Sequence, residues 1–216
     1  DIAVMIDELD PNHPTTTALA GFDADLAALI ETRAPALDFV SIQMYGDIVN
    51  LPRRIEEAGF DGPYMVTEWG ATGHWEVGTT AWDAPIENNS PEKARLYRER
   101  YQRAIASEKE GQCVGSYVFL WGQKQERTPT WYGIFLESGE ETESVEAMHY
   151  IWNGQWPDNR APQVEDFQLD GRKAADDIYL QAGTTYPATA EITDADGDSL
   201  KYFWEIKPES KDLGEG

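Results

Sequence analysis

Along the first 156 residues, short continuous apolar stretches alternate with segments in which apolar residues recur at helical spacing. Short apolar stretches with the length and composition of buried strands lie at residues 15–19, 37–44, 64–68 and 114–120. Segments with apolar residues at helical spacing lie at residues 1–8, 23–32, 51–58, 90–108 and 143–152. Strands that alternate with helices pair in parallel under helical cover. The pattern therefore predicts an α/β fold with four βα units.

The pattern changes after residue 156. Two prolines in a polar stretch indicate a linker at residues 157–162. Beyond it, short stretches of alternating apolar and polar residues predict strands at residues 163–169, 178–180, 185–192 and 200–206. Turns are expected at Asp170-Gly171 and Asp196-Gly197. We therefore expect residues 163–216 to form a partial all-β immunoglobulin-like sandwich.

Charge narrows the range of partners. The chain has 17 basic and 40 acidic residues and a net charge of −23, which disfavours binding to nucleic acid or to an anionic membrane. Such acidity is typical of a protein that handles neutral ligands, and we expect an extracellular or periplasmic location. The single Cys113 excludes an internal disulfide. The first residues already follow a helical pattern, which indicates a piece of a longer protein.

Candidate catalytic chemistry lies where the predicted strands end. Glu68 ends the third strand and is followed by Trp69, Tyr45 ends the second strand, and Trp121 follows the fourth. In βα barrels the carboxyl ends of strands carry the chemistry. A carboxylate held by a tyrosine hydroxyl can attack a sugar, and indole rings can stack on the sugar. The alternatives are an acid paired with an arginine and aromatic side chains that pack at the rim.

Two loops add further candidates for saccharide binding. The loop after the third strand contains His74 and Trp75, and the loop after the fourth contains Gln123, Glu126, Arg127 and Trp131. Polar side chains beside aromatic rings suit a ligand with many hydroxyl groups. The alternatives are a first loop that packs on itself and a surface ion pair between Glu126 and Arg127.

One acidic turn raises the question of a metal. Asp194, Asp196 and Asp198 alternate as at the start of a calcium loop, but the later glutamate and the flanking helices of an EF-hand are missing. Calcium binding and a plain turn both stay open. No motif for a cofactor is present in the sequence, and none is expected.

The strand-end segments at residues 41–45, 62–70 and 116–122 together resemble clan A glycoside hydrolases. They look like the last four βα units of a (β/α)8 TIM barrel, most similar to glycoside hydrolase family 2. The turn at residues 10–14 resembles the segment before the fifth strand of that barrel. The resemblance covers residues 1–156 and implies the C-terminal half of the barrel.

The resemblance also implies a mechanism. Glu68 matches the nucleophile of a retaining hydrolase of β-glycosides, Tyr45 the tyrosine that supports it, and Trp121 the floor of the sugar subsite. The general acid of such enzymes lies on the fourth strand, and no residue of this chain matches it. We therefore expect the chain alone to be inactive and to associate with itself. A carbohydrate-binding protein without catalysis and a surface adhesion module are the alternatives.

Overall fold

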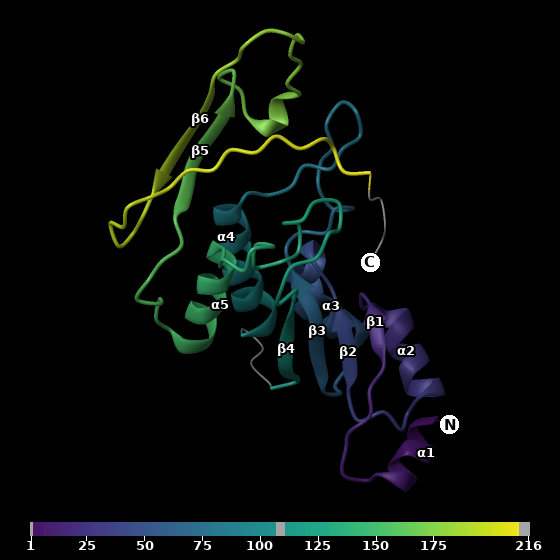
Figure 1. The fold of residues 1–216 in the computed structure, drawn as a ribbon. Coiled ribbons are helices and arrows are strands. Elements are labelled where there is room, and N and C mark those ends of the chain that lie inside the picture. The colour runs from purple at the N-terminus through teal and green to yellow at the C-terminus, as the bar shows by residue number, and fades with distance from the viewer. Residues whose placement is uncertain (1, 107–110, 212–216) are drawn as a thin grey trace. The chain divides into compact units, whose positions relative to one another are not determined.

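The computed structural model describes residues 2–106 and 111–211. Within them four parallel strands form a sheet in the order β1-β2-β3-β4 (Figure 1). The strands are β1 (Ala18–Ala20), β2 (Val40–Gln43), β3 (Tyr64–Gly70) and β4 (Cys113–Phe119). Consecutive strands are neighbours in the sheet, as in the wall of a βα barrel. The parallel βα arrangement expected from the sequence is confirmed, and it is consistent with part of a TIM barrel.

In the described part of the chain, five α-helices accompany the strands. They are α1 (Ile2–Leu9), α2 (Ala24–Arg33), α3 (Leu51–Ala58), α4 (Ser90–Arg100) and α5 (Glu143–Asn153). Shorter helical turns are η1 (Gly46–Asn50), η2 (Tyr101–Ile105) and η3 (Ala174–Asp176). No helix in residues 2–106 or 111–211 is long and apolar enough to cross a membrane.

Local side chains set the helix ends. The Asp23 carboxylate accepts the Leu26 amide at 2.8 Å and starts α2. Gly59 ends α3 with a φ of +64°, which a glycine adopts without steric cost. At the start of α4, Asn89 accepts the Glu92 amide at 3.0 Å and donates its own amide to the Glu92 carboxylate at 3.2 Å. Asn89 is therefore the cap of α4.

Contacts divide the chain into two compact units. The sheet-bearing unit comprises residues 1–70 and 99–119, and the loop-bearing unit comprises residues 71–98 and 120–216. This division differs from the expected boundary at residues 157–162, because the loops after β3 and β4 group with the C-terminal segment. The expected boundary between barrel and module stays a prediction.

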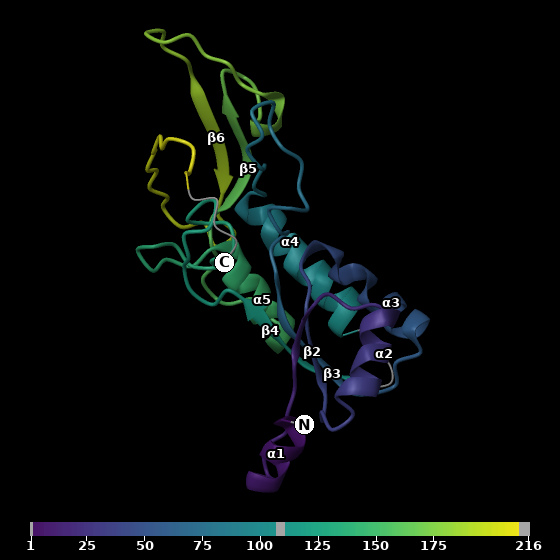
Figure 2. The same cartoon turned by 90° about the vertical axis from the view of Figure 1, so that its right-hand side faces the viewer.

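The core of the sheet-bearing unit lies between the sheet and two helices. Both views place α2 and α3 on the same side of the sheet (Figures 1 and 2). Leu51 and Ile55 lie one turn apart on α3 and are buried. Ile42 and Val66 on the two inner strands are buried completely. This burial of apolar side chains on neighbouring strands and their covering helix is the main stabilising term in such a layer.

The last part of the loop-bearing unit contains one antiparallel hairpin (Figure 2). Its strands are β5 (Gln163–Leu169) and β6 (Ala188–Thr193). The strands predicted at residues 178–180 and 200–206 are not formed, so those two predictions are wrong. Tyr179, Phe203 and Ile206 are exposed, because the described residues provide no second sheet to cover them. An immunoglobulin-like sandwich is therefore not shown.

A buried charge cluster joins the hairpin to α5. Arg160, just before β5, donates to both carboxylate oxygens of Glu146 on α5. The Ala161 amide donates to the same carboxylate at 3.3 Å. Glu143, one turn before Glu146, is only 2% exposed. One arginine thus faces two buried carboxylates, which favours a proton on one of them.

That proton is on Glu143. Burial, and after it the charge of Glu146, raises the pKa of the Glu143 carboxyl from 4.5 to about 7, against the opposing effect of Arg160. The Glu143 Oε1 atom has no hydrogen-bond partner among the described residues, which adds to the cost of an ionised form.

We expect Glu143 to make the chain less stable as the pH rises. The folded state holds the proton more tightly than the unfolded state, so the contribution is complete below pH 4.5 and is lost as the pH rises through about 7. Glu143→Gln should therefore raise the free energy of unfolding at pH 8 by about 2 to 3 kcal/mol and change it little at pH 4.5. Urea unfolding at both values tests this. An equal effect at both values would contradict it.

Candidate active site

A break in the register of β3 places Glu68. Ile42 of β2 pairs with Val66, but the next residue, Gln43, pairs with Glu68, so Thr67 has no partner on β2. The pairing of β3 with β4 also shifts, between Val66 and Trp69. An extra residue in a strand bends it and turns the following side chain to a new direction, often beside an active site.

Tyr45 lies next to Glu68 because of the same register. The Met44 amide donates to the Glu68 carbonyl at 3.0 Å, which holds the end of β2 beside Glu68. The hydroxyl of the following Tyr45 donates to the Glu68 Oε1 atom. Tyr45 is buried, and Phe119 meets its ring edge-on with 6.1 Å between the ring centroids. The tyrosine therefore has a fixed position and can hold the carboxylate in one orientation.

The Glu68 carboxylate itself is partly exposed. Tyr45 is its one hydrogen-bond partner among the described residues, so the Oε2 atom is open. The alternative of an ion pair with an arginine is not formed within the described residues. Arg100 instead donates to the Gly70 carbonyl at 2.7 Å and holds the end of β3. Glu68 thus combines one fixed oxygen with one available oxygen, which suits a nucleophile.

The loop-bearing unit buries another group of titratable side chains. Glu126 is buried and lies 2.8 Å from the Lys124 ammonium and 3.8 Å from the His74 ring. The His74 amide donates to the Tyr132 hydroxyl at 3.2 Å. Burial, as the largest effect, raises the pKa of Tyr132 to about 12. These contacts tie the loop after β3 to the loop after β4. His74 and Glu126 are both buried, and their saccharide contacts stay a prediction.

The expected ion pair between Glu126 and Arg127 is not formed, because the Glu126 carboxylate faces Lys124. Gln123 is half-buried and donates to the Pro129 carbonyl at 3.2 Å. Gln123 and Glu126 thus have partners within the loop, and Arg127 is the remaining polar candidate of the three for contact with a ligand.

The four tryptophans expected to contact a saccharide differ in their exposure. Trp69 is 0% exposed and Trp131 is 2% exposed, so neither ring offers an open face to a sugar. Their expected stacking on a ligand is corrected to packing, and Trp131 also donates to the Thr72 carbonyl at 2.9 Å. Trp75 is 61% exposed and Trp121 is 56% exposed. These two keep the exposure that saccharide stacking requires.

Two features of this region were not foreseen. Trp121 stacks with Trp152 of α5 at 6.1 Å between ring centroids. The buried Lys93 of α4 binds Glu87, whose carboxylate also accepts the Thr128 hydroxyl at 2.5 Å. Burial lowers the pKa of Lys93 and outweighs the opposing effect of Glu87. Spacing could not show the contacts of Trp121 with Trp152 or of Glu87 with Thr128, because these residues lie far apart in the sequence.

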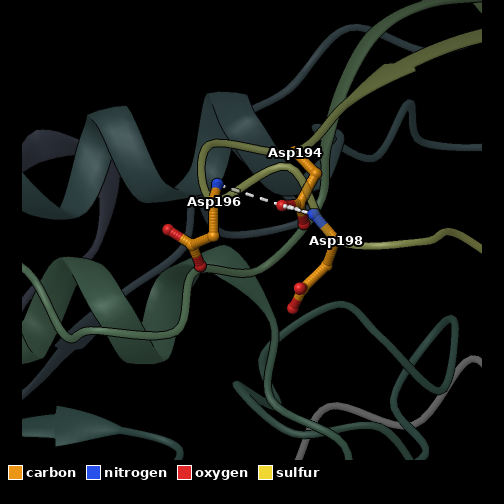
Figure 3. Close-up of side chains that lie close together, drawn as sticks. All are labelled: Asp194, Asp196 and Asp198. Carbon is orange, nitrogen blue, oxygen red and sulfur yellow. Dashed lines mark hydrogen bonds between the residues drawn. The ribbon is translucent and has the colours of Figure 1, made fainter.

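Asp194, Asp196 and Asp198 lie together, with carboxylate oxygens within 4.8 Å of one another (Figure 3). The Asp194 Oδ1 atom accepts the amides of Asp196 at 3.0 Å and Asp198 at 2.9 Å. The Asp196 carboxylate accepts the Arg160 amide at 2.5 Å. The turn is therefore held by its own backbone, and the question of calcium stays open.

No family model and no curated protein matches this sequence. Solved structures do match. A β-glucuronidase of an uncultured Clostridium species is 17% identical with a TM-score of 0.52, over 71% of this chain and 28% of its own. A GH39 β-xylosidase of Caulobacter crescentus is 18% identical with a TM-score of 0.48, over 74% of this chain and 36% of its own.

The likeness is one of fold. A β-D-glucuronidase of Dictyoglomus thermophilum is also similar, at 16% identity and a TM-score of 0.49, over 73% of this chain and 28% of its own. The chain thus spans about a third or less of the length of these enzymes. At such identities the match to the Clostridium enzyme supports the barrel-like arrangement of the strands and helices and no more.

We expect the buried Glu126 to stabilise the loop-bearing unit. Glu126→Ala leaves Lys124 and His74 without their carboxylate, and such loss costs about 2 to 4 kcal/mol of unfolding free energy. Glu57→Ala is the matched control, because Glu57 makes an exposed pair with Arg53 on α3. The control should change the free energy by less than about 0.5 kcal/mol. Equal effects in urea unfolding would contradict the structural role of Glu126.

Proposed function

We propose that this chain is part of a retaining glycoside hydrolase that acts on β-linked glycosides. The observation that carries the proposal is the contact between the Tyr45 hydroxyl and Glu68 at a bulged strand end. A carboxylate that is ordered by a buried hydroxyl, partly exposed and at the carboxyl end of a parallel strand has the position of a barrel nucleophile.

In the proposed reaction the Glu68 carboxylate attacks the anomeric carbon and forms a glycosyl–enzyme ester. The bond to the leaving group breaks, and a second carboxylic acid gives the leaving oxygen a proton. Water then attacks the ester, the second group takes the proton of that water, and Glu68 is released. Tyr45 donates its hydroxyl to the attacking carboxylate and holds it in one orientation. We propose that the second acid lies outside this chain, as the resemblance to clan A hydrolases implies.

For the substrate we propose a neutral oligosaccharide or polysaccharide. The net charge of −23 disfavours a polyanion. In the loop-bearing unit, Trp75 and Trp121 expose rings that can stack on a saccharide. We propose these two, with Gln123 and Arg127, as its saccharide contacts.

Glu68→Ala should abolish hydrolysis in the complete polypeptide that contains this chain, by about 10³-fold or more in kcat/KM. Tyr45→Phe keeps the ring and removes the hydroxyl, so we expect a loss of about 10²-fold. Mass spectrometry after reaction with a slow fluoro-sugar substrate should find the covalent adduct on Glu68. Full activity of Glu68→Ala, or an adduct on another residue, would rule out the assignment.

The second candidate is a carbohydrate-binding protein without catalysis. The exposed Trp75 and Trp121 favour it as much as they favour a hydrolase. The two candidates differ in the fate of a bound glycoside. Binding that depends on Trp75 and Trp121, with no turnover and no adduct in the complete polypeptide, would select the binding protein.

We expect the chain alone to associate with itself. β1 and β4 are the edges of the four-stranded sheet, and such edges can pair with another chain. Val114 and Tyr117 on β4 and several apolar residues of α1 are also exposed. Light scattering should show a mass that rises with concentration. Tyr117→Lys should lower the associated fraction, because a charge opposes edge pairing. A stable monomer at all concentrations would contradict this.

A further inference from the structure

The loop-bearing unit contains a small hollow. Its volume is about 270 Å³, and the loop after β3 and the loop after β4 both line it. The residues that matter for its chemistry are Trp82, Asp83, Arg127, Thr128, Trp131 and Glu209. Pockets for drug-sized ligands begin at roughly 300 Å³, so this hollow suits a single small ring.

Backbone strain gathers at this hollow. Asp83 and Arg127 both have a φ of +61°, and only four residues other than glycine have a positive φ in the described part of the chain. For a bulky side chain such as arginine this conformation is a clear outlier. Strained residues cluster where a ligand or a reaction requires one particular geometry. Two of the four outliers thus line one hollow.

The strain at Arg127 is held by its neighbours. The Thr128 amide donates to the Glu126 carbonyl at 2.7 Å, so Arg127 is the apex of a three-residue turn of the strained form. Glu126 is fixed by Lys124, and Thr128 is fixed by the Glu87 carboxylate. These contacts hold both neighbours of Arg127, and with them its backbone in the positive-φ conformation. The Arg127 residue lines the hollow.

The same hollow combines an open ring with a free donor. Trp82 is 46% exposed and is held edge-on by Tyr179, at 5.6 Å between ring centroids. The buried Nε atom of Arg127 has no hydrogen-bond partner in the part of the chain that the structure describes. Because the Nε atom is enclosed, a ligand in the hollow would contact Arg127 through the terminal nitrogens of its guanidinium. The buried Trp131 also lines the hollow.

The charges select the class of ligand. Asp83 and Glu209 contribute two carboxylates against one guanidinium, in a chain of net charge −23, so an anion is disfavoured. The guanidinium of Arg127 offsets one of the two carboxylates and gives the hollow a hydrogen-bond donor, from which a neutral hydroxyl group can accept. A neutral ring with many hydroxyl groups can accept from Arg127, donate to Asp83 and place its apolar face on Trp82.

We propose that the hollow formed by Trp82, Asp83 and Arg127 binds one ring of a neutral saccharide. A neighbouring hollow of about 670 Å³ shares Arg127 and Thr128, which leaves room for the saccharide to continue. The inference rests on the proposed function for the class of ligand, and it adds Trp82 and Asp83 as partners of the saccharide contact proposed for Arg127.

The test is titration of the whole 216-residue chain with methyl β-xyloside and cellobiose, followed by the NMR signal of the Trp82 indole N–H. We expect saturable shifts of that signal. Trp82→Ala and Arg127→Gly should each weaken binding by about tenfold or more, measured by calorimetry, because stacking or a charged hydrogen bond is lost. Arg127→Gly should not lower the melting temperature, because glycine relieves the strain.

Asp170→Gly is the matched control. Asp170 also has a positive φ, +54°, but lies in the turn after β5 and outside the hollow. This variant should likewise keep its stability and should bind like the parent chain. Glu68→Gln should bind equally well, so loss of catalysis and loss of this site can be told apart.

Three outcomes would overturn the proposal. One is the absence of any shift at Trp82 with either neutral sugar. Another is binding that Arg127→Gly and Trp82→Ala leave unchanged. The third is tighter binding of methyl β-glucuronide than of the neutral sugars, which would show that the hollow selects an anion.

Discussion

The pairing of β3 with both of its neighbours is the constraint on which the candidate site depends. On one side the register moves forward by one residue at Thr67, and on the other side it shifts within the same stretch. That shift lets the Met44 amide reach the Glu68 carbonyl and brings the Tyr45 hydroxyl to the carboxylate. Regular pairing would direct Glu68 to the other face of the sheet, because side chains alternate along a strand.

The loop-bearing unit is organised by buried charge rather than by regular secondary structure. Glu126 pairs with Lys124 and lies beside His74 of the other loop. Glu87 binds Thr128 and Lys93, and Arg160 binds Glu146 and so links the hairpin to α5. Each of these carboxylates would be costly in isolation and is stable because it is paired. The frame is rigid enough to hold Arg127 in a strained turn, which explains how an irregular segment can present a side chain in a fixed direction.

Local signals predicted the helices and the sheet well. The helical spacing at residues 51–58 predicted α3 with both of its ends, and the four apolar stretches all form parallel strands. The failures occur where a strand requires a distant partner. Residues 200–206 alternate like a strand, but within the described chain nothing pairs with them, and Phe203 is exposed. Alternation shows only that a segment could cover a sheet.

The sequence by itself determined the βα order, the acidity and the residue types at the strand ends, because these follow from neighbours along the chain. It also placed Glu68 and Tyr45 at the ends of adjacent strands. Only the tertiary structure decided that the Tyr45 hydroxyl binds the Glu68 carboxylate and that Trp69 and Trp131 are buried. It also decided that Glu126 forms its ion pair with Lys124 and not with Arg127. Register, burial and the choice of ion pair depend on contacts between distant segments, and no local pattern encodes them.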